Sequence, residues 1–413
     1  MGNIVAFGLL YGLVVVFILL IAILAKRPPT RAGRLMVSGE AMRRFSGWVI
    51  RQRRMIFVLF PVLALGAVLG IRNIEYDDNV IRYFDDRYPL RQDSEAIESG
   101  LTGLEALQFS FSAPDGASVF DPVFLRSVDR FAKWIDNQPE VVSVAALTSI
   151  LRDLNRNMSG DGGDPDGVAD TQAANAQLMM FYELSLPVGM DLNILMDVDR
   201  TQTLVTATVR AGRSEELRDL ARRADAWIAE NEPTLSAHAS GAAIAFARIS
   251  ERNNEQMIWG FLTALGLVSA TMIVTLRSIR HGLLSLVPNL LPALLGFGFW
   301  GWTLGDVNLG STVVTTMTFG IVVDDTVHFL MHYLACRRRG HDVEGALADT
   351  FAVVGSAIIL TSVALIMGFA ILITSGFAIN QHIGLLTAVV IVFALICDLL
   401  LLPALLTLSR KRE

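Results

Sequence analysis

The chain has 413 residues, 53% of them hydrophobic, and a mean hydropathy of +0.49. This composition excludes an ordinary soluble protein and indicates a membrane protein. The two cysteines, Cys336 and Cys397, lie in or beside apolar runs, so no disulfide framework is expected in the polar part of the chain. The net charge of −6 hides a sharp asymmetry of charge along the sequence.

Seven apolar runs predict membrane-spanning helices. A hydrocarbon core of roughly 30 Å needs about 20 helical residues, because each residue rises 1.5 Å. Runs of about this length lie at 3–25, 55–71, 257–276, 283–304, 310–335, 352–374 and 383–408. The sequence therefore predicts an α-helical polytopic membrane protein. Its predicted parts are a first span at 1–25, a basic loop at 26–54, a second span at 55–71, a polar domain at 72–256, a five-helix bundle at 257–408 and a tail at 409–413.

Basic residues orient these spans. The loop 26–54 has nine Lys and Arg residues against one acid, and further basic segments lie at 277–280, 337–339 and 410–412. The short loops on the other side contain no Lys or Arg. The positive-inside rule therefore places the C-terminus in the cytoplasm, and it places the N-terminus and the polar domain outside a cell (inner) membrane.

The loop 26–54 contains a predicted surface helix. Met42, Phe45 and Val49 share one face, and arginines lie towards the other. This pattern favours a helix lying in the cytoplasmic membrane interface. A solvated basic linker is the alternative.

The segment 72–256 reads as an α+β domain. Strands are predicted at 104–113, 140–147, 203–210 and 235–241, helices at 121–138 and 214–232, and a Gly/Asp/Pro-rich loop at 158–170. Two consecutive β-α-β-like passes favour a sheet packed against helices. The domain has 17 basic and 31 acidic residues, so no nucleic-acid partner is expected. It contains no nucleophile elbow, phosphate loop or metal-ligand cluster, so no enzymatic activity is expected.

The predicted span 310–335 contains two adjacent acids, Asp324 and Asp325. An ionised Asp at the centre of a membrane helix costs about 2.5–3.5 kcal/mol, so an unneeded pair would be expensive. Adjacent carboxylates repel, which favours retention of a proton on one of them. Such a pair can bind and release H⁺, or exchange it for Na⁺, as its access to water changes. Gly320, one turn earlier, leaves room for a neighbouring helix.

Two histidines follow the acids on the same helix face. His328 lies four residues after Asp324, and His332 lies one further turn along. A proton relay is one interpretation. A metal site of Asp-x₃-His-x₃-His type is another, although no fourth ligand is evident, and a third is that the acids only hydrogen-bond to neighbouring helices. For His332 alone, an interfacial position near the lipid headgroups is favoured.

Polar residues in other spans are candidate partners of the acids. Thr361 and Ser362 can bond to them across a helix interface, or to carbonyls of their own helix. Asp398 is a third acid within a span; it is interpreted as structural, with a place on the ion path as the alternative. The two prolines and the asparagine in "LVPNLLPALLG" (286–296) are predicted to break the span 283–304.

Several ordered motifs carry a family resemblance. "GIVVDDTVHFLMHY" (320–333) resembles the GxxxDD helix motif of resistance-nodulation-division (RND) transporters, closest to the branch with the MMPL, hopanoid-exporter-like and Patched/Dispatched proteins. "SLVPNLLPALLGFG" and "ALICDLLLLPALL" are similar to the flanking helices. The resemblance implies a ferredoxin-like porter domain and an exporter of lipids or other amphiphiles, driven by proton or sodium antiport. It assigns ion coupling to Asp324, Asp325 and His328, with no cofactor beyond the ion.

The chain departs from that family in size. Family members usually have twelve membrane helices and two outer domains, whereas this sequence predicts seven and one, matching the last helix of a first half and a complete second half. We therefore expect either a fragment or a chain that works with a partner supplying the first half; a homo-oligomer is the alternative. A non-transporting sterol- or lipid-sensing or assembly subunit with the same helices is the rival function, and a membrane metalloenzyme is a third.

Overall fold

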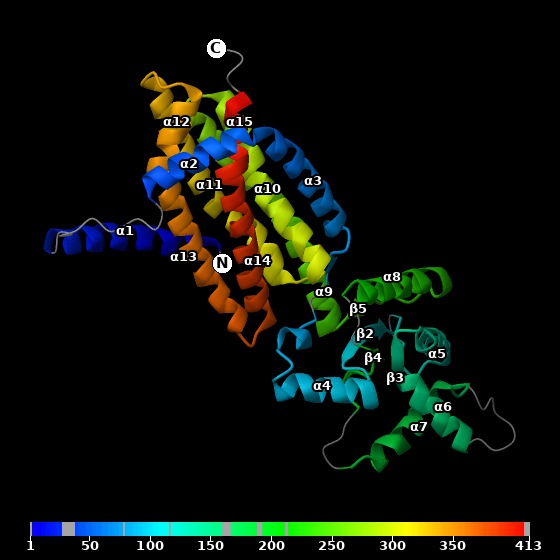
Figure 1. Cartoon of the computed structure of the whole chain (residues 1–413). Helices are drawn as coiled ribbons and strands as arrows, with labels where there is room; N and C mark the ends of the chain where they lie inside the picture. The colour runs from blue at the N-terminus through cyan, green and yellow to red at the C-terminus, as the bar shows by residue number, and fades with distance from the viewer. Residues whose placement is uncertain are drawn as a thin grey trace.

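The computed structural model describes residues 2–26, 38–76, 79–114, 117–158, 167–187, 192–210 and 214–408. These residues form a bundle of long apolar helices and a smaller α+β domain at one end of the bundle (Figure 1). We call this the domain end of the bundle and the opposite end the far end. The predicted fold class, a polytopic helical membrane protein with one α+β domain, is confirmed.

Within the described residues, six helical segments are long and apolar enough to cross a membrane. They correspond in order to the last six predicted spans. Two of them contain a π-helical turn, at Phe351–Gly355 and at Cys397–Leu401. The helices of the bundle are α3 (Arg53–Ile71), α9 (Ala242–Leu276), α10 (Ile279–Thr303), α11 (Leu309–Arg338), α12 (Val343–Thr350) with α13 (Ser356–Ile371), and α14 (Ala378–Ile396) with α15 (Leu402–Thr407).

The first predicted span is not among these six, and a seventh crossing stays a prediction. The first predicted span, 3–25, does form one helix, α1 (Gly2–Lys26). This helix has 25 residues and is apolar along nearly its whole length. Figure 1 shows α1 apart from the bundle and lying across its long direction. An apolar run in a sequence does not reveal whether the helix it forms has neighbours.

The predicted break in the fourth span is wrong, because α10 continues through Pro288, Asn289 and Pro292. Each proline removes one backbone donor, but packing against neighbouring helices holds the helix together, and prolines are tolerated in membrane helices for this reason. The continuous α10 keeps Asn289 inside the bundle, where its side chain is buried.

Helix α10 packs closely against α3 through small residues. A Cβ atom on Gly298 would lie 2.3 Å from the Cα atom of Ala67. Trp302 Nε1 donates to the Gly66 carbonyl oxygen at 2.9 Å. Small residues allow two membrane helices to approach until their backbones touch, which gains dispersion energy along the whole seam.

The surface helix predicted in 26–54 is α2 (Gly39–Arg51), but its apolar face packs against protein rather than lipid. Met42 and Val49 are buried, and Met42 lies against Gly355 in the π-helical turn. Arg43 forms an ion pair with Asp349 of α12 at 2.8 Å. Figure 1 shows α2 crossing the bundle near its far end, beside α12 and α15. The apolar face of α2 is thus covered by protein, whereas the position of the helix at the membrane interface stays a prediction; periodicity shows that a face is buried but not what buries it.

The α+β domain contains one four-stranded antiparallel sheet in the order β3-β4-β2-β5. With α5 between β2 and β3 and α8 between β4 and β5, this is the ferredoxin-like arrangement that the resemblance implied. The strands are β2 (Glu105–Ser112), β3 (Val141–Ala146), β4 (Gln202–Val209) and β5 (Ala239–Ser240), and the helices are α4 (Pro89–Gly100), α5 (Pro122–Asp136), α6 (Leu147–Met158), α7 (Gln172–Ser185) and α8 (Ser214–Asn231).

The core of this domain lies between one face of the sheet and the helices α5 and α8. Alternate residues of β2 and β4, such as Phe109 and Val205, are fully buried. Phe131 of α5 packs edge-on against Phe109. The sequence missed α4, α6 and α7, and the strand predicted at 235–241 is reduced to two residues. Much of the predicted loop 158–170 lies outside the described residues.

A short strand pair and one long helix connect parts of the chain at the domain end of the bundle. The short strand β1 (Glu75–Tyr76), after α3, pairs in parallel with β6 (Asp306–Val307), between α10 and α11. Helix α9 is a single helix of 35 residues that starts beside the sheet and ends inside the bundle. One continuous helix therefore joins the domain to the bundle.

Candidate functional site

The two predicted acids lie near the middle of α11 but face different surroundings. The side chain of Asp324 is 72% exposed and that of His328 is 67% exposed, and Asp324 Oδ1 lies 3.5 Å from His328 Nε2. Asp325 is partly buried, and its Oδ2 accepts a hydrogen bond of 3.4 Å from Ser362 Oγ of α13. One acid therefore points away from the bundle and the other into it.

The two neighbouring hydroxyls of α13 behave differently, although the sequence treats them alike. Ser362 reaches Asp325 across the helix interface, so this predicted contact is present. Thr361 Oγ1 donates instead within its own helix, to the carbonyl oxygens of Ala357 and Ile358 at 3.1 and 3.0 Å. Successive side chains of a helix point in different directions, so Thr361 faces away from α11 while Ser362 faces it.

The face of α11 that carries Asp324 is uncovered by the described residues. A Cβ atom on Gly320 would meet no heavy atom within 4 Å, so the room predicted there is open space. His332 turns towards α12, where its Nδ1 lies 3.2 Å from Thr350 Oγ1. No group of three or more potential ligands that could hold a metal ion occurs in the described ranges.

A second polar cluster lies inside the bundle, and its centre is Thr326. Thr326 Oγ1 lies 2.7 Å from Asp398 Oδ1 and 2.7 Å from Asn289 Oδ1, which joins α11, the last membrane segment and α10. Asp398 is only 1% exposed and lies in the π-helical turn Cys397–Leu401. π-helical turns are frequent at functional sites.

The sequence reasoning identified Asp398 but missed Thr326 and Asn289. Thr326 directly follows the acid pair and so faces a different side of α11. Asn289 lies between two prolines, and the expectation of a helix break there left no reason to predict a buried amide at this position. A polar amide between two prolines in an otherwise apolar helix was the available signal.

An apolar groove lies between α3, α9 and α10. Its volume is about 540 Å³, and it is lined by Ile71, Ile74, Phe261, Val287, Leu290, Leu291, Ala293, Leu294 and Phe297. All of these residues are hydrophobic, and most belong to membrane-spanning segments. A groove of this kind can hold a hydrocarbon chain but offers no partner to a polar group.

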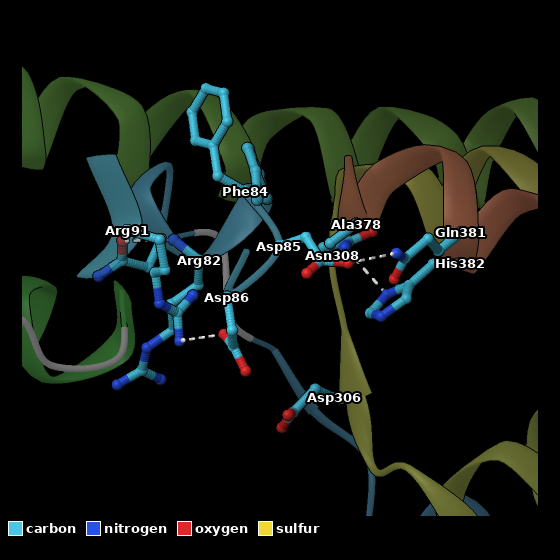
Figure 2. A pocket seen from close by; sticks show the side chains of 12 residues that line it. Arg82, Phe84, Asp85, Asp86, Arg91, Asp306, Asn308, Ala378, Gln381 and His382 are labelled. Atoms are coloured by element: carbon cyan, nitrogen blue, oxygen red, sulfur yellow. Dashed lines mark hydrogen bonds and ion pairs between the residues drawn. The ribbon is translucent and has the colours of Figure 1, made fainter. Parts of the chain in front are cut away.

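A polar cavity of about 360 Å³ lies at the domain end of the bundle (Figure 2). Its walls come from the segment after β1, from β6 and from the start of α14. Figure 2 shows Asp86 beside Arg91 on one side, and Asn308 beside His382 on the other. The charged residues that line it are Arg82, Asp85, Asp86, Arg91 and Asp306.

Hydrogen bonds fix one wall of this cavity. Asp85 accepts from the side chain of Arg87 at 3.0 Å, and this bond holds the pKa of Asp85 below its ordinary value. Gln381 of α14 donates to Asp85 at 3.4 Å, and the backbone N–H of Asp85 donates to the Gly376 carbonyl at 3.1 Å. The segment before α4 is thereby tied to the start of α14.

Comparison with known proteins gives the family. The model of the MMPL family, a family within the RND superfamily, matches residues 136–412, which is most of the chain. The chain therefore belongs to the MMPL family of membrane proteins, and the resemblance to RND transporters is confirmed.

Two similar proteins are named as membrane proteins. One from Methanocaldococcus jannaschii is 25% identical over 155 residues, covering 37% of this chain and 39% of that protein. One from Streptomyces coelicolor is 30% identical over 175 residues, covering 41% of this chain and 24% of that protein. The chain thus matches well under half the length of these relatives.

Proposed function

We propose that this chain is one half of an ion-driven exporter that moves lipids or other amphiphiles, with H⁺ or Na⁺ bound at Asp324 and Asp325. The observation that carries the proposal is the open face of α11. A carboxylate that is 72% exposed and a histidine that is 67% exposed lie near the middle of a membrane helix. Such groups are costly in lipid, so they are expected to face water or a protein partner.

The arrangement of the two acids suits binding and release of an ion. Asp324 with His328 lies on the side that a partner or water can reach, whereas Asp325 with Ser362 lies on the bundle side. An ion bound on one side changes the repulsion felt by the other carboxylate, because the two are adjacent. Repacking of α13 against α11 would then follow the loading of the pair.

The proposed orientation places the far end of the bundle in the cytoplasm and the α+β domain outside the cell membrane. The basic segments at the far end, including α2 and the end of α11, support this through the positive-inside rule. The apolar groove supports a cargo with a hydrocarbon part. Helix α9 would pass movement of the bundle to the outer domain. The proposal includes no enzymatic step.

A partner is proposed to cover the open face of α11. The partner is either a separate first half or a second copy of the chain. Gly320 lies on this face with free space around it, so Gly320→Cys can form a crosslink to whatever covers it. A band at twice the mass of the chain would identify a second copy, and a band at another mass would identify a separate half.

The deciding experiment measures transport in inside-out membrane vesicles from cells that express the chain, so that a natural partner is present. Vesicles are energised by a proton or a sodium gradient in separate runs, with a fluorescent phospholipid as probe. The double variant Asp324→Asn with Asp325→Asn is expected to abolish gradient-driven movement at normal expression. Undiminished transport would end the proposal.

Two single variants provide a matched pair for the same assay. Ser362→Ala removes the hydroxyl that contacts Asp325, whereas Thr361→Val removes a hydroxyl that bonds only within its own helix. The first is expected to lower coupled transport severalfold and the second to leave it unchanged. The rival function, lipid sensing without transport, predicts lipid-dependent partner binding that neither the double variant nor the gradient alters.

A further inference from the structure

The polar cavity at the domain end contains an imidazole whose tautomer can be deduced from its neighbours. Asn308 is the N-cap of α11: its Oδ1 accepts from the backbone N–H of Ser311 at 3.1 Å and from Ser311 Oγ at 3.3 Å. A backbone N–H can only donate, so the atom facing it must be the amide oxygen. The amide nitrogen of Asn308 therefore faces His382.

This orientation fixes the state of His382. Asn308 Nδ2 lies 2.9 Å from His382 Nδ1. An amide nitrogen only donates, so Nδ1 must accept and carry no proton, and the neutral ring holds its proton on Nε2. Trp300 also packs against the imidazole in a T-shaped contact, with the ring centroids 5.1 Å apart and an interplanar angle of 74°.

Protonation is incompatible with this contact. An imidazolium has a donor on each nitrogen and no acceptor, so Nδ1–H would point at the N–H groups of Asn308. Rotation of the amide would relieve the conflict only by turning its nitrogen towards the N–H of Ser311, which removes the cap of α11. A protonated His382 must therefore separate from Asn308 or uncap the helix that carries the acid pair.

We propose that His382 is a proton-binding site at the domain end of the bundle, and that its occupancy releases α14 from the N-terminus of α11. The site lies in a cavity of about 360 Å³ that provides a place for the displaced ring. Its role in transport rests on the proposed function, in which this end faces outward, but the release itself does not.

The ring faces charged groups of both signs across the cavity. Asp85, Asp86 and Asp306 are acidic, and Arg82 and Arg91 are basic. Trp300 at the end of α10 and Asn308 at the start of α11 contact the ring, and both are uncharged.

The first test is the tautomer, read by ¹⁵N NMR of histidine-labelled protein in detergent, with His382→Gln used to assign the signal. At mildly alkaline pH, His382 is expected to show a protonated Nε2 and a bare Nδ1. On acidification, Trp300 fluorescence is expected to fall through quenching by the imidazolium, and His382→Gln should remove this component. A proton on Nδ1 in the neutral state would overturn the proposal.

The second test is hydrogen exchange of the peptide segments 308–312 and 378–382, corrected for the intrinsic effect of pH. Acidification is expected to speed exchange roughly fivefold in the native chain, as for loss of a helix cap. His382→Gln should abolish this change, because a glutamine side chain accepts from Asn308 at any pH. Exchange in the native chain that stays as slow in acid as at neutral pH would refute the release.

Asn308→Asp is the matched variant. Aspartate also caps a helix well, and its second oxygen can accept from a protonated His382. It is therefore expected to keep exchange slow in acid and to move the titration of His382 to higher pH. If hydrogen exchange in Asn308→Asp speeds up in acid as it does in the native chain, the donor–donor conflict between His382 and Asn308 is not the cause of the release.

The acid-pair variant separates this proposal from the proposed function. Asp324→Asn with Asp325→Asn should leave the titration of His382 and the exchange change intact while transport is lost. Normal transport in that double variant would remove the coupling proposal but not the proton site. Loss of the exchange change in the His382 tests would remove the site but not the coupling.

Discussion

The seam between α3 and α10 allows a quantitative prediction from one added methyl group, Gly298→Ala. The new Cβ would lie 2.3 Å from Ala67 Cα, 2.4 Å from Ala67 Cβ and 2.7 Å from the Ala67 carbonyl oxygen. None of these atoms can move by rotation of a side chain. The two helices must therefore separate by roughly 1 Å at this point, since ordinary contact begins near 3.4 Å.

The expected cost follows from the lost packing. A gap of 0.5–1 Å forfeits about a quarter to a half of each dispersion contact it opens, and overpacked cores lose typically about 1–3 kcal/mol. Alanine is favoured over glycine inside a helix by about 1 kcal/mol, which offsets part of this loss. We expect a net loss of up to about 2 kcal/mol in the free energy of unfolding.

The assay is reversible unfolding in mixed micelles of mild detergent and sodium dodecyl sulfate. Gly266→Ala in α9 is the matched control, because a Cβ atom there meets nothing within 4 Å. This control should be neutral or stabilised by up to about 1 kcal/mol. If Gly298→Ala proves as stable as Gly266→Ala, the close approach of α3 to α10 is not present in the folded protein.

Three further predictions concern other contacts. Arg130 forms an ion pair with Glu232, whose side chain is 5% exposed, and this bond holds the pKa of the Glu232 carboxyl below its ordinary value of 4.5. The ion pair therefore stabilises the folded state above pH 4.5, and this stabilisation is lost as Glu232 becomes protonated in acid. Arg130→Gln should lower the free energy of unfolding by about 1 kcal/mol at neutral pH, a small value because the arginine is exposed to solvent. In denaturant titrations, the difference in stability from the native chain should shrink in acid. A difference that does not change with pH would refute a stabilising ion pair. Thr326→Val leaves the buried oxygen of Asp398 without its donor and should cost about 1–3 kcal/mol in micelle unfolding, whereas Thr326→Ser should be close to native. Met42→Ala should cost at least about 2 kcal/mol in the same assay because Met42 is buried against protein; a negligible cost would favour a lipid-facing α2.

Much of the architecture could be predicted from the sequence, because the signals are local. A run of about 20 apolar residues needs only its own composition to indicate a span, and six such runs are helices of the expected length. The strands 104–113 and 203–210 were recognisable by their alternation, since a sheet with one buried face imposes a period of two. Asp324 and Asp325 stood out because acids are rare in membrane helices.

The remainder depended on which helices are neighbours, and no single segment contains that information. Thr361 and Ser362 are adjacent and chemically alike, yet only Ser362 reaches Asp325, because α13 presents that residue to α11. The joining of Asp398 to Asn289 through Thr326 requires three helices to meet.

The faces of α2 and α11 show the same division between sequence and tertiary structure. The sequence by itself determined that α2 has an apolar face and that α11 carries acids near its middle, because both follow from residue spacing along one helix. Only the tertiary structure decided that Met42 is covered by protein while Asp324 is open. Burial is a property of what lies beside a helix, and neighbours are brought there by packing between segments far apart in the chain.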